Sequence, residues 1–277
     1  MSIKLVAIDL DGTLLNDHHE INQPVVDAIK KAREAGVYVV LSTGRPLSGT
    51  RAQLDVLGLN NIDDYIITYN GALVLNTNTW DIVAEHGLTR ENYLEIDHLA
   101  RLLNVHLHLA DKKEMYTSNR DISPYTILES YLVNMPLHYR TPEEIAAENV
   151  LPIKMMMIDD PEVLNKAFKK IPADYFERYT LVRSTPYFLE VLNPNASKGI
   201  ALKELSEHLG IKQSEVMAIG DAENDLSMIE FAGTGIAMGN ASETIKAAAD
   251  YTVATNLEDG VKEAFDRWVL KNSSTSF

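Results

Sequence analysis

Apolar runs and helical stripes alternate over the first 85 residues of the chain. Ile3–Ile8, Val37–Leu41 and Tyr65–Tyr69 are short and mostly apolar, as buried strands are. Between the first two, apolar residues recur at helical spacing from a capping residue at Asn22 to a stop at Gly36. A second helix is expected before the third strand. This series is typical of a parallel sheet with helices on its faces.

The same alternation returns near the C-terminus. Ser197 is expected to cap a helix that continues to Leu209. The elements expected after it are strands over Val216–Ile219, Gly235–Met238 and Tyr251–Ala254 and helices ending at Ala232, over Ser242–Ala249 and over Glu258–Leu270. The mostly polar tail, residues 272–277, is expected to fray. The fold class is therefore α/β, a doubly wound, Rossmann-like parallel sheet built from residues 1–85 and 191–277.

Residues 86–190 follow a different pattern. A helix is expected over Arg90–Leu103, and strict alternation over Val105–Leu109 predicts a half-exposed strand. The other elements expected here are strands over Met155–Ile158, Leu181–Val182 and Phe188–Leu192 and a helix over Pro161–Ile171. This order indicates a separate α+β unit inserted into the first domain. His106 and His108 share one face of the alternating strand, which is more typical of a polar strand face than of a metal site.

Charge and composition exclude several classes of protein. The 277 residues include 25 basic and 40 acidic side chains, and the formal net charge is −15. Such a surface repels polyanions, so we expect no nucleic-acid partner. No apolar stretch reaches the roughly 18 residues of a membrane span, and no secretory leader pattern opens the sequence. We therefore expect no membrane partner, a cytoplasmic location, and a monomer or a small homo-oligomer. The lack of cysteine excludes disulfides and thiolate chemistry.

The candidate chemistry begins at the end of the first predicted strand. Asp9 and Asp11 follow the apolar run and precede Gly12 and Thr13. Side chains at positions i and i+2 leave a strand on the same side, here at the carboxyl end where open α/β sheets bind ligands. Two carboxylates so close repel each other unless a cation or a shared proton compensates them. The pair therefore indicates a metal site, a nucleophile with an acid–base partner, or both.

Three further elements fall at predicted strand ends or helix starts. Ser42–Arg45 is a run of small hydroxyl and glycine residues whose backbone N–H groups can cradle a phosphate. Lys198 lies in the first turn of the helix capped by Ser197, where the helix dipole and the ammonium both favour an anion. The motif Gly220-Asp221-x-x-Asn224-Asp225 again places two acids, Asp221 and Asp225, after an apolar strand. Each element alone is weak evidence, but the combination is specific.

This combination, in this order, resembles the haloacid dehalogenase-like hydrolase superfamily over the whole chain. The spacing from Asn70-Gly71-Ala72 to the late insert resembles the Cof-type phosphatases, which carry a large α/β cap domain. The resemblance implies an Mg²⁺-dependent phosphatase whose partners are small phosphate esters, most often sugar phosphates. It also implies that residues 86–190 form the cap that sets substrate specificity.

The resemblance implies a role for each matching residue. Asp9 would attack phosphorus and form an aspartyl-phosphate, and Asp11 would act as acid and then base. The metal-binding set would be Asp9, the backbone of Asp11, Asp221 and, through water, Asp225. The phosphoryl oxygens would be held by Leu10, Thr43, Gly44, Lys198 and Asn224. Four residues are expected either to contact substrate or to form structural ion pairs: Arg45, Arg120, Asp121 and Glu190.

Three other functions use similar residues. A phosphomutase or phosphotransferase would pass the same aspartyl-phosphate to a second hydroxyl. A receiver-like signalling domain also uses a phosphorylated aspartate with Thr, Lys and Mg²⁺, but it lacks an acid two residues later and is about half as long. A non-catalytic phosphate sensor would not need Asp11.

Overall fold

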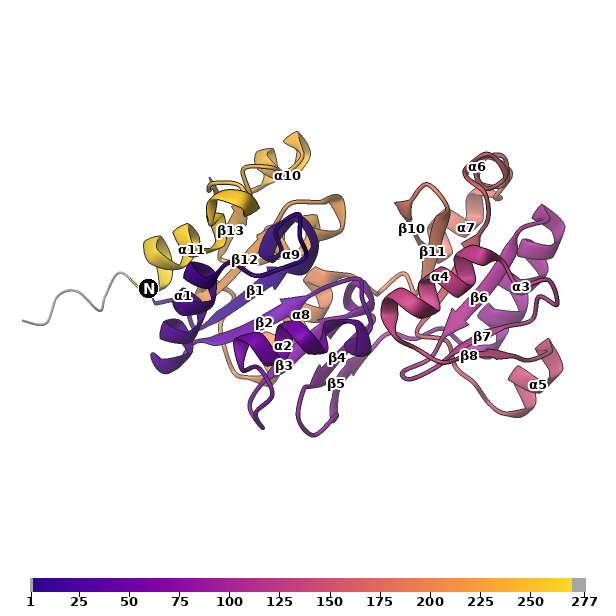
Figure 1. The fold of residues 1–277 in the computed structure, drawn as a ribbon, viewed down its shortest axis with the longest axis horizontal. Coiled ribbons are helices and arrows are strands. Elements are labelled where there is room, and N and C mark those ends of the chain that lie inside the picture. The colour runs from indigo at the N-terminus through magenta and orange to yellow at the C-terminus, as the bar shows by residue number, and fades with distance from the viewer. Residues whose placement is uncertain (1, 271–277) are drawn as a thin grey trace, which may run out of the picture. The chain divides into compact units, whose positions relative to one another are not determined.

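The computed structural model describes residues 2–270, which fall into two structural units (Figure 1). One unit combines the chain up to Glu85 with the chain from Ser197 onward, and the other is His86–Ala196. The expected boundary at residues 190/191 differs from this division because strand β11, Phe188–Leu192, continues across it. The frayed tail expected at residues 272–277 lies outside the described residues.

The first unit is built on an eight-stranded sheet in the order β14-β13-β12-β1-β2-β3-β4-β5. Its strands are β1 Leu5–Asp9, β2 Tyr38–Ser42, β3 Tyr65–Thr68, β4 Leu73–Asn76, β5 Ile82–Glu85, β12 Val216–Gly220, β13 Thr234–Ala237 and β14 Tyr251–Thr252. Strands β14 to β3 pair in parallel, which confirms the doubly wound α/β fold. The antiparallel strands β4 and β5 were not predicted. Because β4 starts directly after the turn at Tyr69–Gly71, the chain has no room for a parallel crossover.

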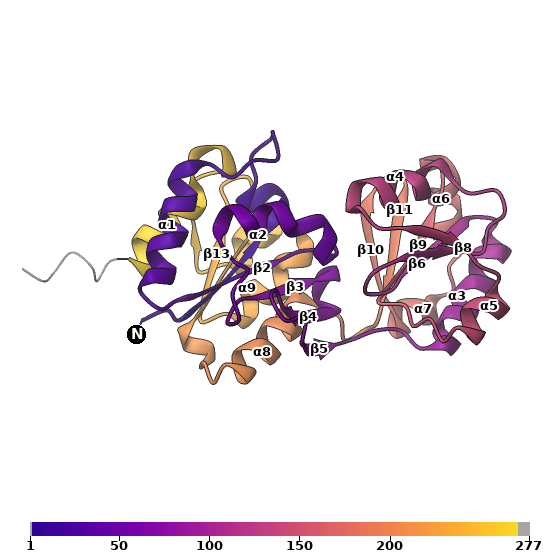
Figure 2. The same ribbon diagram turned by 60° about the horizontal axis from the view of Figure 1, so that its bottom comes forward.

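Helices cover both faces of this sheet. They are α1 Gln23–Glu34, α2 Arg51–Leu57, α8 Lys198–His208, α9 Leu226–Phe231, α10 Glu243–Ala248 and α11 Gly260–Ala264. Leu202 of α8 and Met228 of α9 belong to one apolar cluster with Ala7 of β1. Helices α1 and α2 lie on the opposite face (Figure 2). Because β1 pairs in parallel with both β2 and β12, the carboxyl ends of these three strands lie at the same edge of the sheet.

The second unit is built on a six-stranded sheet in the order β10-β11-β9-β6-β7-β8. Its other strands are β6 His106–Ala110, β7 Met115–Thr117, β8 Leu137–Tyr139, β9 Lys154–Ile158 and β10 Thr180–Thr185. Its helices are α3 Arg90–Leu103, α4 Pro124–Val133, α5 Pro142–Ala147, α6 Pro161–Phe168 and α7 Ala173–Arg178. The helix expected over Pro161–Ile171 is therefore shorter, and α7 follows it.

The prediction of a half-exposed strand over Val105–Leu109 was wrong. Leu107 packs on one face of the sheet with α3 and α6, while residues of α4 cover the other face. His108 is consequently buried, and its Nδ1 lies 3.3 Å from the Thr126 hydroxyl of α4. Burial, followed by the nearby Lys154 ammonium, lowers the pKa of His108 to about 3. Alternation of polar and apolar residues indicates two faces but not which of them a helix covers.

Among residues 2–270, no helix has both the length and the apolar composition that crossing a membrane requires.

Candidate active site

Asp9 and Asp11, the two acids at the carboxyl end of β1, have different surroundings. Asp9 is the last residue of the strand and is buried, whereas Asp11 lies in the following turn and its side chain is half exposed. The Arg45 guanidinium holds Asp11 with two hydrogen bonds, from Nε to Oδ2 at 2.9 Å and from Nη2 to Oδ1 at 2.5 Å. Arg45 thus binds an acid of the candidate site.

Lys198 is the buried cation of the site. Its Nζ donates to Asp9 Oδ1 at 2.5 Å and to Asp225 Oδ1 at 2.5 Å, and its side chain is 0% exposed. The predicted helix cap at Ser197 places Lys198 in the first turn of α8. The Ser197 hydroxyl accepts a hydrogen bond from the Ile200 N–H at 3.2 Å. Burial disfavours the ammonium, but Asp225 and Asp9 outweigh it and raise the pKa of Lys198 above its usual value. The lysine is therefore a fixed positive charge between two carboxylates.

The loop after β12 supplies the other two acids. Asp225 Oδ2 accepts hydrogen bonds from the backbone N–H groups of Asp221, at 2.9 Å, and Ala222, at 3.0 Å. Asp221 Oδ1 accepts from the Thr13 hydroxyl at 2.6 Å. A Cβ atom on Gly12 would lie 2.4 Å from Asp221 Oδ2, so only glycine lets the two loops approach this closely.

The carboxylates of Asp9, Asp221 and Asp225 converge, with one oxygen of each within 4.8 Å of the others. Burial is the largest cause that raises the pKa of Asp9, and Asp225 adds to it. Burial likewise raises the pKa of Asp221 to about 6, against the Thr13 hydrogen bond. A bound cation would offset this excess of negative charge. Because Mg²⁺ prefers carboxylate oxygens, the donor set fits that ion.

The neighbouring loop after β2 offers fewer free N–H groups than we expected. The Thr43 N–H donates to the Ile67 carbonyl at 2.9 Å, and the Arg45 N–H donates to the Thr43 hydroxyl oxygen at 3.1 Å. Of the Thr43 donors, only the hydroxyl hydrogen remains for a phosphate. Gly44 lies against the side-chain amide of Asn70, since a Cβ atom on Gly44 would be 3.1 Å from Nδ2 and from Oδ1 of Asn70. Leu10 has a buried side chain and could contribute only its backbone.

Sequence reasoning missed Asn70 as a site residue. Its Oδ1 accepts from Asn224 Nδ2 at 2.9 Å, which links the loop after β3 to the loop after β12. Asn70 is buried and has a positive φ of 55°. The signal in the sequence was the Asn70-Gly71 pair directly after a predicted strand, a pair that favours left-handed backbone.

Replacing Gly71 by Ala is expected to lower the free energy of unfolding by about 1–3 kcal/mol, since overpacked sites relax poorly. Gly71 has φ +93°, and a Cβ there would lie 2.2 Å from the Ser197 carbonyl oxygen, next to Lys198. Gly210→Ala is the matched control, because Gly210 has φ +67° and a Cβ there would meet no atom within 4 Å. Urea unfolding measures both variants. An equal loss of unfolding free energy in Gly71→Ala and Gly210→Ala would show that the close approach of Gly71 to Ser197 does not limit stability.

The remaining predicted residues belong to the second unit. Arg120 and Asp121 line a pocket within that unit. Glu190 is not among the residues that line it. Glu190 is buried in β11, and its Oε1 lies 3.6 Å from Lys154 Nζ, while Glu129 Oε1 of α4 lies 3.7 Å from the same ammonium. Glu190 therefore takes part in an ion pair inside the unit, and any contact of its side chain with substrate stays a prediction.

The α/β sheet gathers three carboxylates and a buried lysine at the carboxyl ends of its parallel strands, the edge where α/β proteins bind their ligands. A family model for haloacid dehalogenase-like hydrolases matches residues 6–265, and the chain belongs to this family.

Relatives and a solved structure agree with this assignment. YxeH of Bacillus subtilis, named as a candidate phosphatase, is 47% identical over 96% of this chain and 98% of its own length. YcsE of Bacillus subtilis, named 5-amino-6-(5-phospho-D-ribitylamino)uracil phosphatase, is 34% identical over 98% of this chain and 97% of its own. The solved structure of BT4131, described as a subclass IIB sugar phosphatase, aligns with a TM-score of 0.75 and 25% identity, covering 95% of this chain and 98% of that one.

Proposed function

We propose that the protein is an Mg²⁺-dependent phosphatase that hydrolyses small phosphorylated metabolites, most often sugar phosphates, through an aspartyl-phosphate. The observation that carries this proposal is the buried contact of Lys198 with Asp9 beside the Asp221 and Asp225 carboxylates. A nucleophilic carboxylate, a fixed cation and a cation-binding acid cluster are the parts that phosphoryl transfer requires.

In the first step, one Asp9 carboxylate oxygen forms a bond to phosphorus, and the bond from phosphorus to the leaving oxygen breaks. Asp11 gives its proton to that oxygen, so the alcohol leaves uncharged. In the second step, Asp11 takes a proton from water as the water attacks the aspartyl-phosphate, which releases phosphate and restores Asp9. The Arg45 guanidinium holds the Asp11 side chain with two hydrogen bonds and so fixes its position for both steps.

The other side chains hold the phosphoryl group. Lys198 neutralises Asp9 and the equatorial oxygens, and the Thr43 hydroxyl and the Asn224 amide bind those oxygens. Mg²⁺, when bound by Asp9 and Asp221, supplies positive charge that offsets the repulsion between the phosphoryl group and the nucleophile. Both oxygens of Asp225 already accept hydrogen bonds, from Lys198 and from two backbone N–H groups, which favours an indirect role toward the cation.

The substrate class rests on the relatives. BT4131 is described as a sugar phosphatase, and YcsE is named for a ribityl phosphate, so both names describe phosphorylated polyhydroxyl compounds. We extend this class to the present chain and assign the choice among its members to the second unit, His86–Ala196. A phosphotransferase would use the same Asp9 chemistry, but it would require a second hydroxyl acceptor in place of water.

Removal of the cation is expected to abolish activity. Phosphate release from a panel of sugar phosphates should stop with excess EDTA and return when Mg²⁺ is restored, because the carboxylate cluster otherwise repels the phosphate dianion. Water alone should suffice as acceptor, with no added bisphosphate. A rate that is unchanged in EDTA would refute the metal requirement, and turnover only with an added hydroxyl acceptor would favour phosphotransfer.

A further inference from the structure

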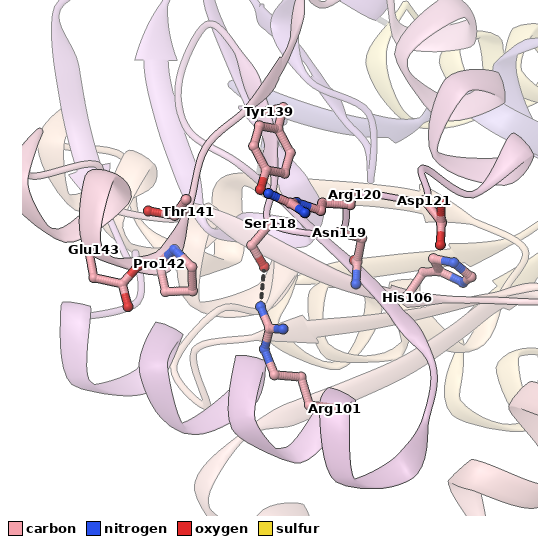
Figure 3. A pocket seen from close by; sticks show the side chains of 10 residues that line it. All are labelled: Arg101, His106, Ser118, Asn119, Arg120, Asp121, Tyr139, Thr141, Pro142 and Glu143. Carbon is pink, nitrogen blue, oxygen red and sulfur yellow. Dashed lines mark hydrogen bonds between the residues drawn. The ribbon is translucent and has the colours of Figure 1, made fainter.

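The second unit contains a pocket of its own. It has a volume of about 480 Å³, which is in the usual range for small-molecule sites, and its lining side chains are mostly polar or charged (Figure 3). It lies where β6 begins and where β7 and β8 end, so the three strand ends and the first turn of α5 line it. These elements all belong to His86–Ala196.

One side of the pocket presents hydrogen-bond donors that no protein group uses. In the described part of the chain, the Arg120 guanidinium has no hydrogen bond or ion pair, and the Tyr139 hydroxyl has none either. In Figure 3, Arg120 extends in the direction of Tyr139. Arg101, by contrast, is held by Asp97 at 2.7 Å and by Ser118 at 2.9 Å. A free guanidinium in a pocket is a bidentate site for a carboxylate or a phosphate.

Asn119 is fixed so that its amide can add to this donor set. Its Oδ1 accepts from the Leu107 N–H at 2.8 Å and from the Thr117 hydroxyl at 3.3 Å. Both bonds use the oxygen, so the Nδ2 group, drawn in Figure 3 at the free end of the side chain, is left to donate. The Leu107 N–H can only donate, so its bond to the oxygen keeps the amide from turning over. The pocket thus has a rigid neutral donor beside a free cation.

The other side of the pocket presents acceptors. His106 Nδ1 lies 2.8 Å from Asp159 Oδ2, so this nitrogen donates to the carboxylate, and in a neutral imidazole Nε2 is then an acceptor. Asp121 turns away from Arg120 toward the His106 side in Figure 3, and its carboxylate has no hydrogen bond or ion pair to another described residue. An imidazole nitrogen and a free carboxylate both accept hydrogen bonds from hydroxyl groups.

We propose that this pocket binds a small organic anion that also carries hydroxyl groups. The carboxylate or phosphate of the ligand contacts Arg120, Asn119 and Tyr139, and its hydroxyls donate to Asp121 and His106. A neutral polyol would leave the guanidinium unpaired, and an anion without hydroxyls would face Asp121 unfavourably. The inference does not rest on the proposed phosphatase activity, since binding here requires neither Asp9 nor a metal.

Calorimetric titration of the full chain in EDTA tests the proposal with three probes: D-gluconate, D-glucose 6-phosphate and uncharged D-glucose. We expect at least one anion to bind, and glucose to bind at least about tenfold more weakly, since it lacks the charge-assisted hydrogen bonds. Arg120→Gln should weaken anion binding by a similar factor. Arg90→Gln, which changes an exposed arginine of the same unit outside the pocket, should leave it unchanged.

The outcomes separate the sources of the anion. Binding of both anions, gluconate and glucose 6-phosphate, through Arg120 shows that a negative charge and hydroxyl groups suffice for recognition. Binding of glucose 6-phosphate without gluconate identifies phosphate as the recognised group. Anion binding that is equal in Arg120→Gln and in the unchanged protein places the ligand elsewhere and overturns the proposal. Failure of both anions to bind at millimolar concentration overturns it as well. A protein that binds gluconate through Arg120 but releases no phosphate would support the pocket and refute only the phosphatase.

Discussion

Asp9→Asn is expected to reduce phosphate release by at least about 10³-fold, the order of loss seen when a catalytic nucleophile is removed. The amide has nearly the same shape as the carboxylate but cannot attack phosphorus. The fold should persist, because Lys198 keeps its contact with Asp225. Initial rates at saturating Mg²⁺, with the thermal unfolding midpoint measured beside them, give the comparison.

A control variant, Asp64→Asn, distinguishes the loss of the nucleophile in Asp9→Asn from the general effect of removing a buried charge. Asp64→Asn also neutralises a buried carboxylate of the first unit, one that pairs with Arg33 at 2.8 Å outside the site. It should lose stability and keep its rate constant per folded molecule. If Asp9→Asn retained activity within tenfold of the unchanged protein, Asp9 would not be the nucleophile.

Lys198→Met is expected to lower the free energy of unfolding by about 3–5 kcal/mol, because removing one partner of a buried ion pair leaves uncompensated charge. Here two carboxylates, Asp9 and Asp225, would lose their shared cation. Added Mg²⁺ should recover part of the loss, since the same carboxylates can bind it. Urea unfolding in EDTA and in Mg²⁺ measures both effects, and phosphate release should fall with the loss of the cation.

Lys203→Met provides the control for Lys198→Met. Lys203 lies on the same helix, α8, but its side chain is 59% exposed and its Nζ is 4.0 Å from Glu207. Exposed pairs of this kind contribute at most about 1 kcal/mol. Equal stability of Lys198→Met and Lys203→Met in EDTA would contradict the view that the buried ammonium holds the acid cluster together.

The positions of the main acids could be predicted because parallel strands bring their carboxyl ends to one sheet edge. Asp9 and Asp221 each follow an apolar run, which placed both at strand ends, and the family resemblance implied that they would meet. The lysine was also predictable as a residue near an anion, since Ser197 marked the start of its helix. Its complete burial between two carboxylates was not, because burial depends on contacts that no local pattern encodes.

Other features depended on contacts distant in sequence. The link between Asn70 and Asn224 joins loops 154 positions apart. Asn22 occupies the expected N-cap position of α1, but its side chain bonds to Asn16 and Asp259 instead of the helix N-terminus. In the second unit, the helix α4 covers a sheet face that the alternation around His108 suggested was exposed. Local pattern predicts an element and its polarity, whereas its neighbours decide which face is buried.

The central claim is that Asp9 carries the phosphoryl group, and trapping that group tests it most directly. Asp11→Asn should still form the aspartyl-phosphate from a reactive ester but hydrolyse it slowly, because no base activates water. Rapid acid quench followed by peptide mass spectrometry should then find one phosphoryl group on the peptide that contains residue 9, and none in the Asp9→Asn, Asp11→Asn double variant. Turnover in the unchanged protein with no phosphoryl-enzyme at any quench time, in either background, would contradict the account.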